Sequence, residues 1–277
     1  MKTVLELLRL STDYLAARGV PSAARAAEEV IGAGLQMPRL NLYLHFEKPV
    51  TAEETVRCRE LLERRGKREP IQYLVGEVEF YGCPLWVTPA VLIPRPETEQ
   101  LVDKVAAGLE PTGKVLWDVC CGSGCIGIAL KKKFPEMEVV ASDISAEALA
   151  VARKNAERNG VEIELLQGDL LAPFAGRQCD YVVCNPPYVA AAEYSELQPE
   201  VRDHEPRGAL VAGDSGLEIY ERLAEGLPSL LREGRRAWLE IGTGQGEEVQ
   251  KLFPDFKSLV ECDWAGHQRF FSLEKLV

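Results

Sequence analysis

The segment VLWDVCCGSGCIGIAL, residues 115–130, decides the fold of the larger part of this chain. An apolar run ends in a glycine-rich turn, and a second apolar run follows it. Gly122, Gly124 and Gly127 match the pattern G-x-G-x-x-G. Glycine lets the backbone turn tightly and approach a ligand without a Cβ in the way. The segment is therefore predicted to form a strand, a ligand-binding turn and a helix.

More strand-like segments follow this turn, with helical segments between most of them. The strands are predicted at 114–120, 137–143, 161–168, 180–185, 235–242, 257–263 and 268–274. The last two have no convincing helix between them, so we expect a terminal hairpin that places an antiparallel strand at the sheet edge. The expected fold class is α/β, with a seven-stranded, doubly wound, Rossmann-like sheet.

Residues 1–75 are expected to form a small all-helical domain. Apolar residues at helical spacing predict a helix within 4–15, and a second helix is predicted to begin at Ser22. Thr51 and Glu54 form a T-x-x-E capping box, which predicts a third helix that ends near Gly66. Residues 76–92 are predicted to be a β-hairpin linker, and 93–277 to be the ligand-binding domain.

Basic residues cluster along the third predicted helix. Such a cluster is typical of a solvated helix face, and the alternative is a patch that docks a partner. The cluster consists of Arg57, Arg59, Arg64, Arg65, Lys67 and Arg68.

The composition is that of an ordinary globular protein, with 46% hydrophobic and 27% charged residues. No apolar run reaches the roughly 20 residues that a membrane helix needs, and the N-terminus does not resemble a signal peptide. We therefore expect no membrane association and a cytoplasmic location. The eight cysteines contain no C-x-x-C pair and there are only three histidines. This argues against a metal site and favours buried, unpaired cysteines.

The net charge of −11 is unevenly spread along the chain. The first 70 residues hold 12 Lys and Arg against 10 Asp and Glu, whereas the remaining 207 hold 20 against 33. An acidic body is a poor docking surface for a phosphate backbone, whose affinity comes largely from Lys and Arg. The charge therefore argues against a nucleic-acid substrate without excluding one.

Acidic residues at the ends of the predicted strands favour a nucleoside-containing cofactor. Asp143 follows the glycine turn by about 20 residues, where a carboxylate can accept the ribose hydroxyls. Asp118, just before the glycines, would repel the pyrophosphate of a dinucleotide. Asp169 ends the third strand, where an acid suits an adenine amino group. These acids favour S-adenosylmethionine, and a nicotinamide cofactor remains the alternative.

The segment YVVCNPPYV, residues 181–189, places a stiff Asn-Pro-Pro-Tyr sequence at the end of the fourth predicted strand. In a doubly wound sheet this strand end lies at the same edge as the glycine turn. The Asn185 side-chain oxygen and the Pro186 carbonyl could accept both N–H groups of a planar nitrogen and stabilise the charge that develops on it. Pro187 would stiffen the turn, and Tyr188 could pack on the flat face of the target. No general base or metal is required.

Four motifs resemble one enzyme family over nearly the whole chain. They are VLIPRPETE (91–99), NPPYV (185–189), HEPRGAL (204–210) and DSGLEIY (214–220). The chain is similar to the PrmC (HemK) family of class I methyltransferases. The resemblance implies methylation of the glutamine of the Gly-Gly-Gln motif in class I peptide-chain release factors. It also implies a helical N-terminal domain that docks this protein substrate, and a hairpin linker.

The same resemblance assigns roles to residues of this chain. The cofactor loop falls on Cys120, Cys121, Gly122, Ser123 and Gly124, the ribose-binding acid on Asp143, and the adenine side on Asp169 and Leu170. The amide grip falls on Asn185, Pro186, Pro187 and Tyr188. The family loop usually reads D-L-G-T-G-S/T-G, so Cys120 and Cys121 replace a Gly and a Thr, and a Cβ at Cys120 could crowd the methionine part of the cofactor. Arg95 and Glu97 are expected to cap and pair locally rather than order a substrate channel.

Three rival functions remain open at this point. A nucleic-acid adenine methyltransferase would share the same grip on a planar nitrogen. A cofactor-binding scaffold would need no catalysis, and a nicotinamide dehydrogenase would need an acid–base pair that the chain does not offer beside the glycine turn. Our expectation is a monomeric protein-glutamine methyltransferase that uses S-adenosylmethionine, releases S-adenosylhomocysteine and needs no metal. Its partners are release factors and not nucleic acid.

Overall fold

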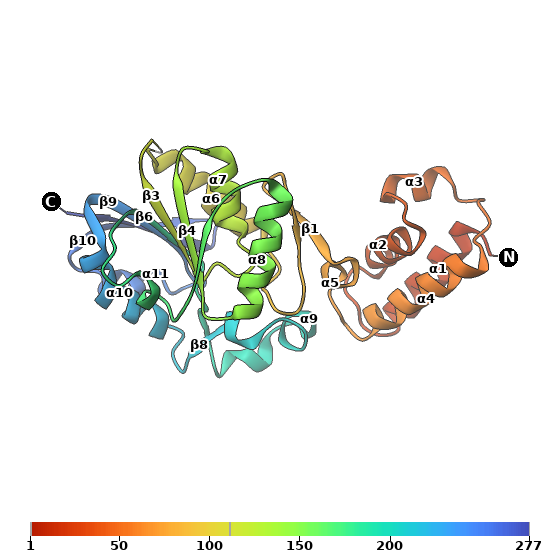
Figure 1. Cartoon of the computed structure of the whole chain (residues 1–277). Coiled ribbons are helices and arrows are strands. Elements are labelled where there is room, and N and C mark those ends of the chain that lie inside the picture. The colour runs from red at the N-terminus through yellow and green to blue at the C-terminus, as the bar shows by residue number, and fades with distance from the viewer. Residues whose placement is uncertain (1, 111, 277) are drawn as a thin grey trace. The chain divides into compact units, whose positions relative to one another are not determined.

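The computed structural model describes residues 2–110 and 112–276. The chain folds into two compact units (Figure 1). The helical unit comprises Met1–Gly76 and Gln198–His204, and the sheet unit comprises Glu77–Leu197 and Glu205–Val277. The sequence analysis places 198–204 with the sheet, but in the structure these residues belong to the helical unit. Among the described residues, no helix combines the length and the apolar character needed to span a bilayer.

The helical unit is built from short, well-capped helices. The capping box predicted at Thr51 and Glu54 is confirmed, and Thr3 and Glu6 form a second one. Buried side chains of the first, second and fourth helices share one core, where a Cβ on Gly34 would lie 2.5 Å from the Cys58 sulfur. The helices are α1 (Val4–Ala16), α2 (Ala23–Leu35), α3 (Arg39–Leu44), α4 (Ala52–Gly66), α5 (Ile71–Val75) and α9 (Pro199–Arg202).

Much of the basic cluster is used inside the helical unit. Arg65 is 9% exposed, and its guanidinium lies 3.0 Å from a carboxylate oxygen of Glu200 in α9. Arg68 donates its Nε–H to the same carboxylate at 2.7 Å, and Arg64 pairs with Glu69. The prediction of a solvated face or a free docking patch is therefore wrong for Arg65 and Arg68, because they anchor α9.

The sheet unit alternates strands and helices as predicted. A short hairpin, β1 (Glu77–Phe80) and β2 (Cys83–Trp86), precedes the main sheet. The strands of the main sheet are β3 (Val115–Val119), β4 (Glu138–Asp143), β5 (Glu164–Gln167), β6 (Cys179–Cys184), β9 (Leu231–Glu240), β10 (Phe256–Cys262) and β11 (Gln268–Lys275). The helices are α6 (Pro96–Gly108), α7 (Cys125–Lys133), α8 (Ala146–Asn159), α10 (Glu218–Leu230) and α11 (Gly246–Leu252). An unpredicted pair, β7 (Val189–Ala190) and β8 (Val211–Gly213), forms a separate small sheet.

The main sheet has the strand order β10-β11-β9-β6-β3-β4-β5. The seven predicted strands and the antiparallel terminal strand are confirmed, but the predicted position of that strand is wrong. The antiparallel strand β11 lies between β9 and β10 rather than at the sheet edge. The backbone of β11 pairs with both neighbours, so the edge strand is β10.

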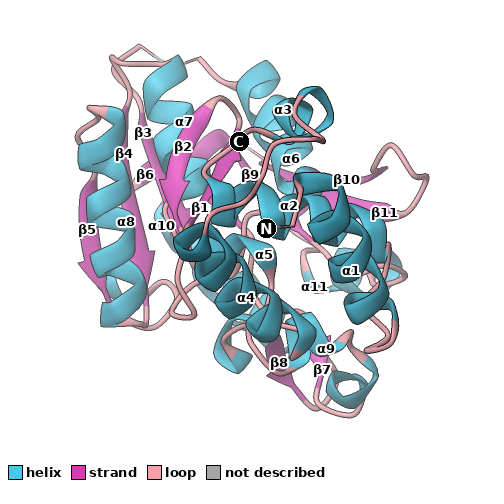
Figure 2. Ribbon diagram, turned by 90° about the vertical axis from the view of Figure 1, so that its right-hand side faces the viewer, coloured by secondary structure: helices cyan, strands magenta, loops and turns pink. Residues whose placement is uncertain are grey.

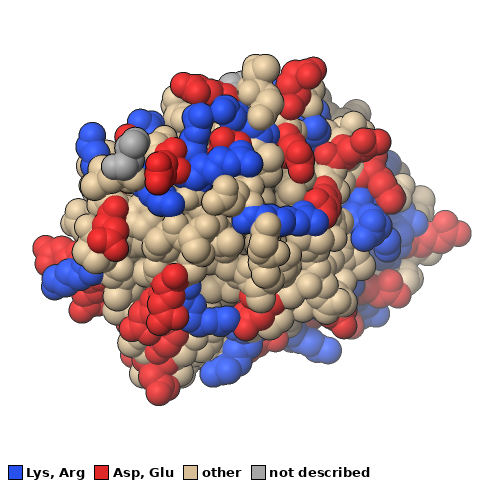
Figure 3. Space-filling model, turned by 60° about the vertical axis from the view of Figure 1, so that its left-hand side comes forward, with Lys and Arg blue, Asp and Glu red and all other residues tan. Residues whose placement is uncertain are grey.

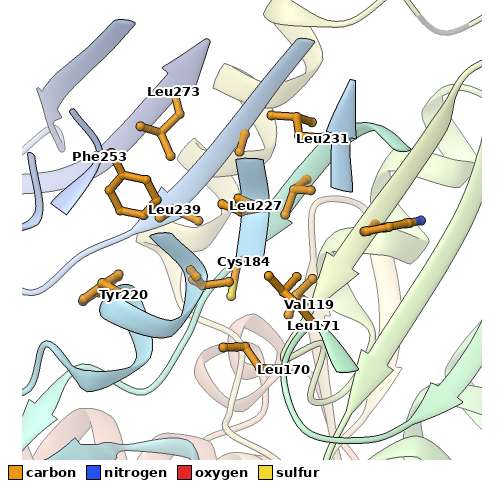
Figure 4. Close-up of a cluster of buried hydrophobic side chains, with 14 of the residues drawn as sticks. Val119, Leu170, Leu171, Cys184, Tyr220, Leu227, Leu231, Leu239, Phe253 and Leu273 are labelled. Carbon is orange, nitrogen blue, oxygen red and sulfur yellow. The ribbon is translucent and has the colours of Figure 1, made fainter. Parts of the chain in front are cut away.

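Helices cover both faces of this sheet (Figure 2). Residues of β6 alternate between two cores, since Val182 and Cys184 pack on the side of α10 whereas Tyr181 and Val183 pack on the side of α6 and α7. Figure 4 shows side chains of β6, β9 and α10 converging in the first of these cores. This period of two is expected for strands that are buried on both faces. The same alternation determines on which face of the sheet each polar side chain of a strand lies.

Candidate active site

A partly enclosed and mostly apolar cavity opens at the carboxyl ends of β3, β4, β5 and β6. Its volume is about 360 Å³, which lies within the usual range of small-molecule sites. The loops after these four strands line it with the predicted residues Cys120 to Ser123, Asp143, Asp169, Leu170, Asn185 and Pro187. Residues far apart in the sequence thus meet at one edge of the sheet, as the doubly wound fold requires.

The turn between β3 and α7 has three residues with positive φ. Gly122 and Gly124 have φ of 53° and 77°, which costs glycine little. Cys120 has φ of 59°, in the left-handed region that costs a residue with a Cβ roughly 1–2 kcal/mol. The family pattern usually places glycine at this position. The replacement of that glycine by Cys120 therefore strains the backbone. The Asn155 side chain holds the turn by donating to the Ser123 carbonyl at 2.9 Å.

Asp143 fastens the same turn from β4. One carboxylate oxygen accepts the Gly122 N–H at 2.8 Å, and the other accepts the Ser145 N–H at 2.9 Å. Burial raises the pKa of Asp143, and these two N–H groups oppose that rise. A carboxylate oxygen has more than one lone pair. Asp143 can therefore hold the turn and still accept a hydroxyl from a ligand in the cavity.

Asp118 acts beneath the turn rather than in the cavity. Its side chain is fully buried, and one oxygen accepts the Gly127 N–H at 2.8 Å. A Cβ on Gly127 would lie 2.9 Å from that oxygen, so the third glycine of the motif makes room for the carboxylate. Burial raises the pKa of Asp118 to about 7, and the charge of Asp143 adds to the rise. No described residue bonds the second oxygen of Asp118, which makes this acid a costly anchor for α7.

The loop after β5 supplies Asp169 and Leu170. Asp169 accepts a hydrogen bond from Arg222 of α10 at 2.7 Å, and both side chains are about half exposed. Leu170 has φ of 52°, a second strained non-glycine residue beside the cavity. The sequence predicts both positions but does not reveal Arg222, which also lines the cavity.

The Asn-Pro-Pro-Tyr sequence follows β6 and contributes Asn185 to the cavity. The Asn185 amide nitrogen donates to the Thr98 hydroxyl oxygen at 3.3 Å. No described residue bonds the Asn185 side-chain oxygen or the Pro186 carbonyl, so both acceptors are available to a ligand. Pro187 lines the cavity as well, whereas Pro186 is buried and Tyr188 is not among the described lining residues.

Main-chain pairing and one glutamine hold the segment after the two prolines. The Val189 N–H donates to the Leu210 carbonyl, and β7 pairs with β8. The Gln245 side chain donates to the Tyr188 carbonyl at 3.0 Å and accepts the Gly242 N–H at 2.8 Å. Burial raises the pKa of Tyr188 to about 12, which keeps its hydroxyl neutral. The prolines are thus one of several constraints on this turn.

Two of the motifs that carry the family resemblance meet in the sheet unit. The carboxylate of Glu205, from HEPRGAL, accepts the Ile93 N–H at 3.1 Å and pairs with Arg95 of IPRPETE. The Glu205 side chain is 1% exposed, whereas that of Arg95 is 31% exposed. Arg95 therefore pairs locally, as predicted, and its side chain also borders the cavity.

The residues around the cavity fit a nucleoside-containing cofactor. A Cβ built on Gly122 would find no atom within 4 Å, so a ligand could approach the backbone there. Asp143 offers carboxylate oxygens beside that opening, and apolar residues such as Val91 and Ile144 form much of the wall. Among the described residues, no cluster of His, Cys, Asp and Glu has the arrangement of a metal site.

Sequence analysis missed four residues that support the site. Thr98 and Glu240 hold Asn185, Gln245 holds Tyr188, and Glu205 holds Arg95. Glu240 offered a signal, because it is a lone acid in the otherwise apolar strand AWLEIG. Thr98 and Gln245 offered none, since their roles depend on which elements pack together.

Comparison with known proteins follows the two units. The family model of the PrmC N-terminal domain matches residues 6–76, and that of the methyltransferase small domain matches residues 97–200. A release factor glutamine methyltransferase of Chlamydia trachomatis is 43% identical over 273 residues, covering 97% of this chain and 93% of that protein. The one from Geobacter sulfurreducens is 41% identical, covering 91% and 88%. The one from Bacillus anthracis is 36% identical, covering 98% and 99%.

Solved structures resemble part of the chain at lower identity. A methyltransferase of Pyrococcus furiosus has a TM-score of 0.55 and 17% identity, covering 71% of this chain and 90% of that chain. The 16S rRNA N2 G1207 methyltransferase of Thermus thermophilus, solved with AdoMet and guanosine, has a TM-score of 0.53 and 18% identity, covering 72% and 49%. At these identities the likeness establishes the fold.

Proposed function

The chain belongs to the family of release factor glutamine methyltransferases, and from this premise we propose that it methylates the side-chain amide nitrogen of a release-factor glutamine. The proposed methyl donor is S-adenosylmethionine. The proposed target is the glutamine of the Gly-Gly-Gln motif in class I release factors. One observation carries the proposal: Asn185 and the glycine turn line a single cavity.

The cofactor half of the site consists of the turn Cys120 to Gly124 and the acids around it. We infer that the Gly122 backbone lies against the ligand, that Asp143 accepts the ribose hydroxyls, and that Asp169 and Leu170 border the adenine. When bound, S-adenosylmethionine supplies an electrophilic methyl group. Asp143 would serve two purposes here, because the carboxylate that holds the turn also holds the ligand.

The substrate half of the site consists of two hydrogen-bond acceptors after β6. The Asn185 side-chain oxygen and the Pro186 carbonyl would accept the two N–H groups of the glutamine amide. An amide nitrogen is a weak nucleophile because its lone pair is delocalised, and fixed acceptors stabilise the positive charge that develops on it. Pro186 and Pro187 fix the geometry of these acceptors. Tyr188 packs against the hydrophobic core and lies outside the cavity lining, so the expectation that it packs on the target stays a prediction.

The helical unit is the proposed docking module for the release factor. Arg65 and Arg68 are poor candidates for this role, because both already bind Glu200. Helix α3 instead exposes Leu40 and Leu44, which are 70% and 69% accessible. Replacing both leucines with Asp should raise KM for the release factor at least tenfold and leave cofactor affinity unchanged. An unchanged KM would remove α3 from the docking surface.

The surface charge suits a protein partner better than a nucleic acid. On the face shown in Figure 3, Lys and Arg side chains are interspersed with Asp and Glu rather than gathered into one basic track. Nucleic-acid sites generally need such a track. We therefore retain the expectation that nucleic acid is not the substrate. The expectations that no metal takes part and that the enzyme acts as a cytoplasmic monomer do not depend on this charge pattern and stay predictions.

A substrate panel tests the proposed function. The purified protein is incubated with radiolabelled S-adenosylmethionine and either a class I release factor, duplex DNA or RNA. We expect label in the release factor alone, and loss of that label with Asn185→Ala. Label in DNA or RNA alone would overturn the proposal in favour of an adenine methyltransferase.

A further inference from the structure

Two buried residues beside the cavity form a hydrogen-bonded chain with Asn185. The Asn185 amide nitrogen donates to the Thr98 oxygen at 3.3 Å, and the Thr98 hydroxyl donates to the Glu240 carboxylate at 2.8 Å. Thr98 is 1% exposed and Glu240 is 2% exposed. Water cannot readily replace either bond at such burial. The family assignment of the site does not use either residue.

The fold brings these residues together from three elements. Thr98 lies in the first turn of α6, Asn185 follows β6, and Glu240 ends β9. Trp238, which lies two residues before Glu240 in β9, packs in the core on the α6 side of the sheet. Side chains two residues apart point the same way along a strand, so Glu240 also faces α6. The acid is therefore placed under Thr98 by strand alternation.

The chemistry of this chain of bonds has a direction. An ionised carboxylate can only accept hydrogen bonds, so it takes the single hydroxyl proton of Thr98. The Thr98 oxygen is then left as an acceptor, and it can bond only the nitrogen end of the Asn185 amide. The oxygen end of that amide must point the other way. The Asn185 amide is thereby fixed in one of its two possible orientations.

We propose that Thr98 and the ionised Glu240 are positioning residues, which hold Asn185 with its side-chain oxygen toward the cavity and so select an N–H donor as the target group. The proposal rests on the proposed function, because it deepens the role of the Asn185 acceptor. An Asn185 turned the other way would present its NH₂ group. That orientation would favour a glutamate carboxylate over a glutamine amide.

Protonation of Glu240 would reverse the direction of the chain. A neutral carboxylic acid can donate its proton to the Thr98 oxygen. The Thr98 hydroxyl is then free to donate to the Asn185 side-chain oxygen, which requires the amide to turn over. Burial raises the pKa of Glu240 to about 7, while the Thr98 hydroxyl and the charge of Arg269 oppose the rise. The charged groups that act on Glu240 from neighbouring elements are Arg95, Glu97 and Arg269. The charge of Glu240 in turn raises the pKa of Cys125, Tyr188 and Tyr220, which also face it. We expect the Asn185 side-chain oxygen to point toward the cavity above pH 7 and to lose this fixed orientation below that pH.

The first experiment measures methyl transfer by two Thr98 variants. Thr98→Val keeps the shape and removes the hydroxyl, so kcat should fall about 100-fold, as expected for a displaced reacting group. Thr98→Ser restores the hydroxyl and should return kcat to within about threefold of the unmodified enzyme. Tyr220→Phe is the matched control. Its buried hydroxyl bonds the Glu240 main-chain carbonyl rather than the carboxylate, so kcat should stay within about twofold. Equal kcat for the Val and Ser variants would overturn the proposal.

The second experiment does not depend on the identity of the substrate. The chain has only four asparagines, so selective ¹⁵N-asparagine labelling gives a sparse spectrum of side-chain NH₂ groups. The Asn185 signal is identified by its absence in Asn185→Asp. It should shift as pH passes through about 7, and this titration should vanish in Glu240→Gln. The Asn155 signal is the internal reference, because that buried amide bonds Ser123 and Trp86 instead.

The two experiments separate failure of this inference from failure of the proposed function. If the unmodified protein does not methylate a release factor but the Asn185 signal titrates with Glu240, the positioning chain stands and the proposed substrate is wrong. If the Asn185 signal is the same in the unmodified protein and in Glu240→Gln at every pH, the positioning chain is wrong whatever the substrate.

Discussion

The two turns that meet at the cavity are held by opposite means. After β3, the turn gains its shape from backbone freedom, and buried carboxylates hold its main-chain N–H groups. After β6, two prolines remove backbone freedom, and a buried side-chain network holds Asn185. The first turn offers a close-fitting surface for a ligand that keeps its place. Under the proposed function, the second offers fixed acceptors for the amide group that reacts.

The comparison predicts that the largest effect on turnover lies in the second turn. Asn185→Ala should lower kcat by about 100- to 1000-fold, because it removes a preorganised acceptor at the reacting nitrogen. The affinity for S-adenosylmethionine should stay within about threefold. Steady-state kinetics and calorimetric titration of the cofactor measure the two quantities. A parallel loss of cofactor affinity would show that the two turns are not separable.

Glu240, the buried acid of β9 that supports the second turn, should make the stability of the protein depend on pH. Burial raises the pKa of Glu240 from its usual 4.5 to about 7, so folding favours its protonated form. Its stabilising contribution is fully present below pH 4.5 and is lost as the pH rises to about 7. Relative to Glu240→Gln, the unmodified protein should therefore lose roughly 3 kcal/mol of unfolding free energy between pH 4.5 and pH 8.

Denaturant unfolding of both proteins at several pH values measures this difference. The comparison with Glu240→Gln isolates Glu240 from Asp118, whose pKa is also raised to about 7 by burial. A difference that does not change with pH would mean that Glu240 has an ordinary pKa in the folded protein.

The first turn should control cofactor affinity. Asp143→Ala removes a carboxylate that bonds two N–H groups, so the Kd for S-adenosylmethionine should rise about 10- to 100-fold. Asp169→Ala is the matched comparison. Its carboxylate is half exposed and already pairs with Arg222, so the rise should be no more than about fivefold. Titration calorimetry measures the Kd for both variants. A larger rise with Asp169→Ala than with Asp143→Ala would show that Asp143 is not the main cofactor-binding acid.

The smallest predicted effect concerns backbone strain at Cys120. Cys120→Gly should raise the free energy of unfolding by up to about 1 kcal/mol, because glycine adopts a φ of 59° without a Cβ penalty. Cys121→Gly is the neighbouring control. Cys121 is buried without a positive φ, so its loss should destabilise the protein. Thermal unfolding of both variants measures this difference. Equal destabilisation by Cys120→Gly and Cys121→Gly would show that the Cys120 backbone is not strained.

Sequence patterns predicted the elements that carry the site more fully than the contacts that hold it. The glycine turn, Asp143 and the Asn-Pro-Pro-Tyr sequence were recognisable because each follows an apolar strand and must lie at the same sheet edge. The order of β11 and β10 was not recognisable. Either order satisfies the same hairpin and the same apolar pattern.

The supporting residues could not be predicted because their partners are distant in sequence. Thr98 and Glu240 are separated by 142 positions, and Arg68 and Glu200 by 132. A basic residue beside others on a helix looks the same whether it meets water, a partner or an acid from another segment. Only the packed structure shows that Arg65 and Arg68 hold α9 and that Glu240 lies beneath Thr98.

Tandem mass spectrometry of a class I release factor tests the central claim most directly. The release factor is incubated with S-adenosylmethionine and either the unmodified enzyme or Asn185→Ala. The account predicts a gain of one methyl group on the glutamine of the Gly-Gly-Gln motif with the unmodified enzyme and none with the variant. An unmethylated glutamine, or a methyl group on another residue, would contradict it.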